Sequence, residues 1–385
     1  MKPLLVTLVM LAAGTASAQP TRMLYDTIPF EIVQDKFIVE VRIDGKPAKL
    51  ILDTGGLNIM VADSAEHYGV DILRRHAIAD VNEAGIGVSV GAVRNLKIGR
   101  WMNWDVGKVT VVPGNPFFRE LGVSGALGGE AFSNVCLVID KRNRRLVASH
   151  PYRPPVIPRG TGAEMNMGNS FHAVVPVKFG SAEIDVLFDT GMSGFMSIGA
   201  DDFETICAVE GNAELQHRGY GMLYVGVSGI KNALRDSVFK VNIPVMTLPG
   251  GKELRNVGSL TDKRSATIAG QGLFDYGVVA LDYPRGQFYF LPYESGPSDV
   301  AALTRRWNVR ILPTTDYRYE VVMTLGQTGL AIGDRVWKIN GTELAGLPYA
   351  ESSVEDLLGG DEVETAQIAV GPDKKRLKTI TIRKI

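Results

Sequence analysis

The chain has 385 residues, of which 45% are hydrophobic and 22% are charged. These proportions are ordinary for a globular protein and exclude a largely disordered one. Its 41 basic and 42 acidic residues give a formal net charge of −1, so the charge balance offers nothing to attract a nucleic acid. The 43 glycines and 19 prolines predict many short strands joined by tight turns.

The first 18 residues have the features of a cleaved signal peptide. Lys2 precedes the apolar run Leu4–Ala13, and Ala16-Ser17-Ala18 supplies a small-residue cleavage site. The apolar run is too short for the alternative, an N-terminal membrane anchor, and no later run could span a bilayer. We therefore expect a mature protein that is exported, periplasmic or secreted, with no membrane span after cleavage.

Proline-rich stretches divide the rest of the chain into three parts. The first is His150–Pro158, which extends to Gly162, and the second is Pro292–Pro297. Such composition is typical of linkers. We predict domains at residues 19–150, 165–292 and 300–385.

The first two of these parts repeat each other. Three pairs of segments match in the same order: Lys49–Gly55 with Asp185–Gly191, Ala126–Phe132 with Ile268–Phe274, and Leu137–Asp140 with Val279–Asp282. Three ordered matches indicate an internal duplication, since differences in spacing between them are absorbed by loops.

Each copy is predicted to be mostly β-strand. Phe37–Ile43 alternates polar and apolar residues, turns at Asp44-Gly45, and pairs with Ala48–Leu52 as a hairpin. Two short helices and two flexible, glycine-rich hairpins are also expected, at Asp63–Gly69 and Ala200–Val209, and at Ala84–Gly91 and Gly219–Gly229.

The paired Asp-Thr-Gly motif resembles the active-site loops of the aspartic peptidases. In that family two lobes each contribute one such loop, at the end of a hydrophobic strand. Each loop is crossed by a hydrophobic-hydrophobic-Gly segment, here Ala126-Leu127-Gly128 and Ile268-Ala269-Gly270. The resemblance covers about residues 25–292. It implies an all-β fold with two duplicated retropepsin-like β-barrel lobes and a shared active-site cleft, in which the glycine-rich hairpins act as flaps.

By this resemblance Asp53 and Asp189 are the catalytic pair of an endopeptidase that hydrolyses peptide bonds. Two carboxyl groups at close range cannot both ionise, so they share one proton. The ionised partner takes a proton from the attacking water, and the protonated partner donates to the developing oxyanion. The implied substrate is a polypeptide in extended conformation, and no cofactor or metal is required.

Four further residues are expected to support the pair: Thr54, Gly55, Thr190 and Gly191. The glycines allow backbone amides to approach the carboxylates closely, and the threonines should hydrogen-bond across the junction between the lobes. Pepsin-type sites usually have Ser or Thr after the glycine, whereas this chain has Gly56 and Met192. The pattern is closer to the retroviral type and leaves the pH optimum open.

The C-terminal part resembles a bacterial PDZ domain through Gly329–Gly341, which contains Gly-Leu-Ala-Ile-Gly-Asp and ends in Asn-Gly. Tyr349–Leu358 is expected to be its groove helix and Thr379–Ile385 its closing strand. A PDZ groove adds an extended peptide as one more strand, yet Pro313–Tyr317 lacks the carboxylate-binding loop. A peptide ligand and a purely structural β cap both remain open.

Other chemistries have little support in the sequence. Cys136 and Cys207 are too few for a disulfide framework, and two buried free thiols are favoured over a bond. The five histidines show no metal-ligand spacing. The alternative to an enzyme is a non-catalytic peptide-binding protein that holds extended chains in the cleft, but such a protein would have no reason to keep both aspartates.

Overall fold

The computed structural model describes the backbone of residues 23–79, 85–158, 160, 162–223, 230, 235–263, 266–349, 351–360 and 362–385. Side chains are described for all of these except 78, 79, 85 and 351–353. The predicted signal peptide, residues 1–18, lies outside the described residues, so its cleavage and the export of the chain stay predictions. In the described part of the chain, no helix is long and apolar enough to cross a membrane.

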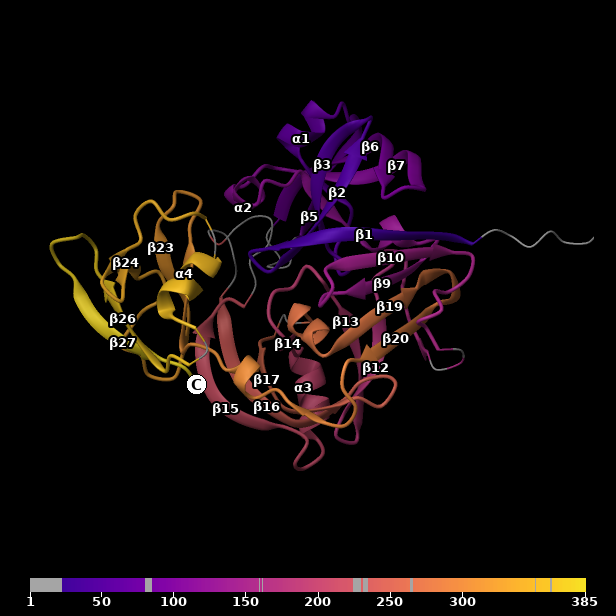
Figure 1. The fold of residues 1–385 in the computed structure, drawn as a ribbon. Helices are drawn as coiled ribbons and strands as arrows, with labels where there is room; N and C mark the ends of the chain where they lie inside the picture. Colours follow the sequence, from indigo (N-terminus) through magenta and orange to yellow (C-terminus); the bar gives the residue numbers. More distant parts are fainter. Residues whose placement is uncertain are drawn as a thin grey trace, which may run out of the picture.

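The described residues are mostly β-strand, which confirms the predicted all-β class (Figure 1). Up to residue 150 the elements are β1 (Leu24–Val33), β2 (Lys36–Ile43), β3 (Lys46–Leu52), β4 (Ile59–Val61), α1 (Ala62–His67), β5 (Asp71–Ala79), β6 (Gly85–Ile98), β7 (Met102–Val112), α2 (Pro116–Glu120), β8 (Gly125–Leu127), η1 (Gly129–Phe132), β9 (Cys136–Asp140) and β10 (Arg145–His150).

The second part of the chain contains β11 (Ala163–Glu164), β12 (Val174–Phe179), β13 (Ala182–Phe188), β14 (Met196–Ser197), α3 (Ala200–Cys207), β15 (Glu214–Gly221), β16 (Asp236–Thr247), β17 (Glu253–Thr261), β18 (Ile268–Ala269), η2 (Gln271–Asp275), β19 (Gly277–Asp282), η3 (Tyr283–Arg285) and β20 (Gln287–Pro292). The C-terminal part contains β21 (Ser298–Asp299), η4 (Ala302–Thr304), β22 (Val309–Pro313), β23 (Tyr319–Leu325), β24 (Arg335–Ile339), β25 (Thr342–Glu343), α4 (Glu351–Leu358), β26 (Thr365–Val370) and β27 (Lys378–Arg383).

Several local predictions are confirmed by these elements. β2 and β3 form the predicted hairpin, and Asp44 and Gly45 at its turn have the positive φ angles that a tight hairpin turn requires. α1 and α3 are the two predicted helices, and each ends two residues earlier than expected. In the C-terminal part, α4 and β27 lie at the predicted helix and closing strand.

The strands around the two Asp-Thr-Gly motifs pair in the same pattern. β3 runs parallel to β8, β8 pairs antiparallel with β4, and β4 runs parallel to β7. In the second part, β13 runs parallel to β18, β18 pairs antiparallel with β14, and β14 runs parallel to β17. Each motif therefore follows a strand that is enclosed by neighbours on both edges.

One continuous sheet contains strands from both of these parts. Within the described residues the sheet order is β11-β20-β19-β9-β10-β1, continuing through β2 and β3 to β5. β9 and β19, the third matched pair of segments, pair antiparallel with each other, and Val138 lies opposite Ala280. One apolar cluster, with members from Ile28 to Val300, fills both parts. The two motifs are thus carried by a single continuous core.

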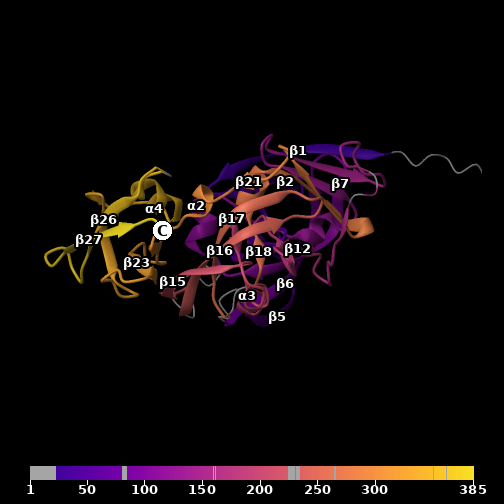
Figure 2. The same ribbon diagram turned by 90° about the horizontal axis from the view of Figure 1, so that it is seen from below.

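The C-terminal part has a core of its own but is not separated from the second part. Its apolar cluster lies between Trp307 and Ile382. However, β23 pairs with β15, so the second sheet continues from one part into the other. Figure 2 shows the C-terminal part at one end of the molecule, beside β15. Because the sheet crosses it, the domain boundary predicted near residue 300 stays a prediction.

This pairing corrects one expectation about the second glycine-rich segment. Gly219 and Gly221 were expected in a flexible hairpin. Both do lie in a strand, β15, that pairs antiparallel with the next strand, β16, but the other edge of β15 pairs with β23, so the glycines are packed between two strands. Residues 224–229 of that segment lie outside the described residues. A Cβ on Gly219 would lie 1.9 Å from the Thr324 carbonyl oxygen, and one on Gly221 would lie 2.3 Å from that of Val322. These glycines permit a close approach of two strands.

The cysteines also differ from expectation. Both are free, as expected, and Cys136 is buried in β9, but Cys207 is exposed. Cys207 is the last residue of α3, whose buried residue is the adjacent Ile206. Because neighbouring positions on a helix face different directions, the burial of Ile206 leaves Cys207 toward solvent.

We expect the substitution Gly219→Ala to weaken the junction between β15 and β23. The added methyl group cannot be accommodated without moving the strands apart, which should lower the free energy of unfolding by about 1–3 kcal/mol. Urea unfolding of the full chain measures this. Gly87→Ala, in β6 of the other glycine-rich hairpin, is the control because its Cβ would meet no atom within 4 Å. Equal stability of the two variants would contradict the close approach described here.

Candidate active site

The two Asp-Thr-Gly motifs occupy equivalent positions at strand ends. Asp53 follows the last residue of β3, and its backbone N–H donates to the Leu127 carbonyl at 2.9 Å. Asp189 follows β13, and its N–H donates to the Ala269 carbonyl at 2.9 Å. The acceptors belong to the two hydrophobic-hydrophobic-Gly segments found in the sequence. Those segments therefore fix the direction in which each loop leaves its strand.

The threonines connect the two loops by reciprocal hydrogen bonds. The N–H of Thr54 donates to the Thr190 hydroxyl, and the N–H of Thr190 donates to the Thr54 hydroxyl, both at 3.1 Å. The Thr54 hydroxyl donates to the carbonyl of Phe188, and the Thr190 hydroxyl to that of Leu52, both at 2.8 Å. Thr54 is 1% exposed and Thr190 fully buried. Each threonine thus bonds to the strand that carries the opposite aspartate.

The glycines bring the two carboxyl groups face to face. A Cβ on Gly55 would lie 2.4 Å from Cγ of Asp189, and one on Gly191 would lie 2.4 Å from Oδ1 of Asp53. Oδ1 of Asp189 accepts from the N–H of Gly191 at 2.6 Å and from that of Gly55 at 3.3 Å. Asp53 and Asp189 are both half-buried, so a side chain at either glycine would displace a carboxyl group.

This arrangement perturbs the proton affinity of Asp53. Removal from water raises the pKa of Asp53 well above its usual range, and the negative charge of Asp189 and a hydrogen bond with its carboxyl group raise it further. The Lys36 ammonium and the N–H of Gly55 act in the opposite direction. Two carboxyl groups so close favour a single shared proton.

Lys36 is a site residue that the sequence did not indicate. It begins β2, and its ammonium donates to the carbonyl of Gly191 at 2.5 Å and to the hydroxyl of Ser193 at 2.8 Å. The contact joins residues 155 positions apart, so no local pattern could have revealed it. Lys36 places a positive charge at the edge of the carboxyl pair and bridges the first part of the chain to the second.

Two buried amides behind the loops were also missed. Asn58 is 3% exposed; its Oδ1 accepts from the N–H of Gly128 at 2.9 Å. Gln271 is 3% exposed, and its Nε2 donates to the carbonyl of Thr190 at 2.7 Å. Gln271 stands where the first copy has Gly129, so the alignment of the two copies already held a signal for it: a polar residue in an otherwise apolar segment.

Pepsin-type sites usually have Ser or Thr where this chain has Gly56 and Met192, and the two positions have different surroundings. A Cβ on Gly56 would lie 2.5 Å from Oδ2 of Asp53, so the Asp53 carboxyl group fills the space that a Ser or Thr would need. After the second motif, next to Met192, the hydroxyl of Ser193 accepts a hydrogen bond from the Lys36 ammonium.

Among the described residues, no group of three or more His, Cys, Asp or Glu side chains is arranged to hold a metal ion.

We expect Thr54→Val and Thr190→Val each to destabilise the fold. Valine keeps the shape of threonine but lacks its hydroxyl, so each variant leaves a buried N–H and a buried carbonyl without a partner, at about 1–3 kcal/mol per group. Because the two threonines share hydrogen bonds, the loss in the double variant should fall short of the sum. Urea unfolding measures all three, with Thr205→Val on the exposed side of α3 as control. Purely additive losses would show that the loops are not coupled.

Comparison with known proteins gives limited information. No protein-family model matches the chain, and no curated protein matches it in sequence. Among solved structures, the chain is similar to the aspartic proteinase from Irpex lacteus, with a TM-score of 0.42 and 12% identity over 70% of this chain and 97% of that one.

Proposed function

We propose that the chain is an aspartic-type endopeptidase in which Asp53 and Asp189 activate a water molecule for attack on a peptide bond. One observation carries the proposal, the reciprocal packing of the two Asp-Thr-Gly loops. Each glycine lies against the aspartate of the other loop. Each threonine hydroxyl donates to the strand that precedes the aspartate of the other loop. A structural role alone would not require two carboxyl groups to be held together at an energetic cost.

The hydrogen bonds around the pair suggest how the roles divide. Oδ1 of Asp189 accepts two backbone N–H groups, which stabilise a negative charge on this carboxylate. The pKa of Asp53 is raised, so the shared proton resides on Asp53. Asp189 then takes the proton from the attacking water, while Asp53 donates its proton to the carbonyl oxygen as negative charge develops there. The proton on Asp189 later passes to the leaving nitrogen.

The surroundings of the pair fit a polypeptide substrate. We interpret the two parts that carry the motifs as retropepsin-like lobes with the substrate cleft between them, and the β5–β6 hairpin as the flap of the first lobe; residues 80–84 at its turn lie outside the described part. The C-terminal part is interpreted as a PDZ-like domain. Among the described strands, β22 pairs with β23 alone, so a peptide could add to its other edge.

Loss of either aspartate should abolish turnover. Asp53→Asn and Asp189→Asn remove the shared proton site, and the double variant should be hardly slower than either single one because the two residues act as a unit. Cleavage of a peptide library by the wild type and the three variants, read by mass spectrometry, measures this. Circular dichroism confirms that the variants are folded. Substantial cleavage by either folded single variant would contradict the mechanism and favour a peptide-binding protein without catalysis.

The pH profile should report the environment of the pair. We expect a bell-shaped dependence of kcat/KM with a mildly acidic optimum, because no hydroxyl at Gly56 or Met192 stabilises the ionised form. Asp53 holds the shared proton, so its pKa sets the alkaline limb of the bell. The Lys36 charge lowers the pKa of Asp53, so Lys36→Met should raise that pKa and move the alkaline limb to higher pH. Lys36→Arg should leave the limb nearly in place.

Lys46→Met is the matched control for this experiment. Lys46 lies at the turn between β2 and β3, at the opposite end of β3 from Asp53, about 20 Å away along the strand. Its profile should match that of the wild type. An alkaline limb that stays in place in Lys36→Met, or that moves equally in Lys46→Met, would rule out Lys36 as the residue that tunes the pair.

A further inference from the structure

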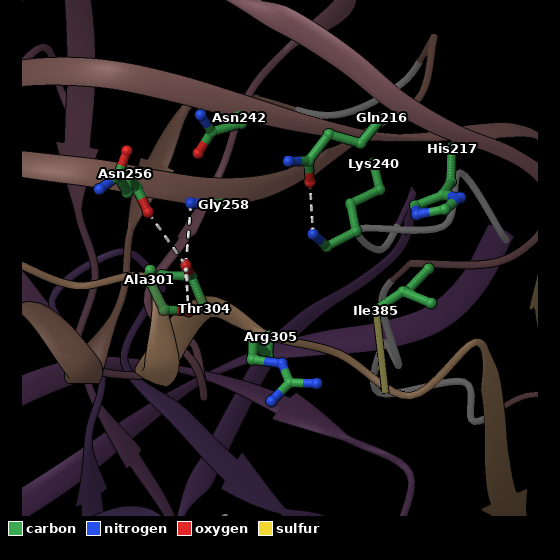
Figure 3. A pocket seen from close by; sticks show the side chains of 10 residues that line it. All are labelled: Gln216, His217, Lys240, Asn242, Asn256, Gly258, Ala301, Thr304, Arg305 and Ile385. Atoms are coloured by element: carbon green, nitrogen blue, oxygen red, sulfur yellow. Dashed lines mark hydrogen bonds between the residues drawn. The ribbon is translucent and has the colours of Figure 1, made fainter. Parts of the chain in front are cut away.

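A second site is indicated by a cavity that lies away from the carboxyl pair, where the β15–β16 hairpin and β17 meet the C-terminal part (Figure 3). Its volume is about 290 Å³. It is lined by Gln216, His217, Lys240, Asn242, Asn256, Gly258, Ala301, Thr304, Arg305 and Ile385. These ten residues include three basic side chains and no aspartate or glutamate.

Lys240 is the unusual member of this lining. It is 6% exposed, and its ammonium donates to Oε1 of Gln216 at 2.5 Å. Within the described residues this neutral amide is its single hydrogen-bond partner, and it forms no ion pair there. An ammonium has three donors, and burying a charge without a compensating partner is costly.

Lys252, in the same part of the chain, shows how this fold satisfies a buried ammonium. It is 5% exposed, close to the exposure of Lys240. Its ammonium donates to the carbonyls of Glu294 at 3.2 Å and Gly296 at 2.8 Å, and to the hydroxyl of Ser298 at 2.8 Å. All three donors are used. At Lys240 two donors remain, and beside it lies a cavity instead of protein atoms.

The charges around Lys240 are of the same sign. Burial lowers the pKa of Lys240, and Arg306 and Arg305 lower it further. Burial also lowers the pKa of His217, followed by the charges of Lys240 and Arg383. The Arg305 guanidinium is balanced by an ion pair with Glu364, whereas Lys240 makes no ion pair with an aspartate or glutamate among the described residues; its hydrogen bond goes to the neutral amide of Gln216. The cavity therefore has the electrostatic character of an anion site.

We propose that this cavity binds a small oxyanion, through a carboxylate or phosphate group that pairs with the Lys240 ammonium. Figure 3 shows Lys240 and Gln216 pointing toward each other, with Arg305 and Ile385 across from them. The bound anion thus connects the β15–β16 hairpin to the C-terminal part. The volume lies just below the range of about 300–1,000 Å³ for small-molecule sites, so the ligand is a small molecule or ion. This goes beyond the proposed peptidase, because neither aspartate lines the cavity.

The test is the thermal unfolding of the full chain in sodium phosphate and in sodium succinate, each against sodium chloride of equal ionic strength. A ligand that binds the folded state raises Tm in a concentration-dependent way. We expect this rise for at least one of the two anions, and the more effective one identifies the group that is recognised. Isothermal titration calorimetry with that anion should give a saturable heat.

Lys240→Met distinguishes the site from a general salt effect. Without anion this variant should melt at or above the temperature of the wild type, because the unpaired buried charge is gone. Its anion-dependent rise should be lost, and its affinity should fall at least tenfold. Lys178→Met, at an exposed position of β12, should respond like the wild type, and so should Asp53→Asn.

Two results would overturn the proposal. The first is a wild type that responds no more to phosphate or succinate than to chloride. The second is a Lys240→Met variant that keeps the full response. Should Lys240→Met fail to fold, Lys240→Gln, which keeps a polar end and removes the charge, takes its place with the same two outcomes. A response that is retained in Asp53→Asn also separates this site from the carboxyl pair, whatever the outcome for peptidase activity.

Discussion

The reciprocal hydrogen bonds of Thr54 and Thr190 are the interaction on which the candidate site depends. They join residues 136 positions apart, and each hydroxyl both accepts from the opposite threonine and donates to the strand before the opposite aspartate. Because the threonines are buried, these bonds are strong and costly to leave unmade. They hold two half-buried carboxyl groups together, which mutual repulsion would otherwise separate. The backbone also joins the two parts symmetrically, because the matched strands β9 and β19 pair with each other.

The electrostatic balance of the site differs from that of the cavity at Lys240. At the carboxyl pair, two acidic groups lie so close that they favour a single shared proton, and Lys36 and two backbone N–H groups partly compensate for the negative charge that remains. At Lys240 a charge is buried with one neutral partner. Lys252 shows that the same fold can satisfy an ammonium completely. Incomplete compensation of charge is thus common to the carboxyl pair and to Lys240, the positions for which we propose catalysis and anion binding.

The parts of the structure that the sequence predicted depend on local patterns or on the repeat. Alternation and a two-residue turn gave the β2–β3 hairpin, and the matched segments pointed to the two loops that the structure brings together. Lys36 could not be found this way, since its contacts lie 155 and 157 residues away. The glycines of β15 were misjudged for a different reason. Sequence shows that glycine lacks a side chain, but whether this serves flexibility or close packing depends on the strand beside it, here β23.

The close packing at β15 changes the relation of the C-terminal part to the site. That part contacts both of the parts that carry an Asp-Thr-Gly motif: β23 extends the sheet through β15, and the hydroxyl of Tyr317 hydrogen-bonds with Arg119 and Glu120 of α2. At the first contact, Met222 and Leu223 pack with apolar residues of β22 and β23. A domain tethered by a linker alone would move independently. This one is held by a sheet, two apolar clusters and a polar contact, so moving it would break contacts with both the β15–β16 hairpin and α2.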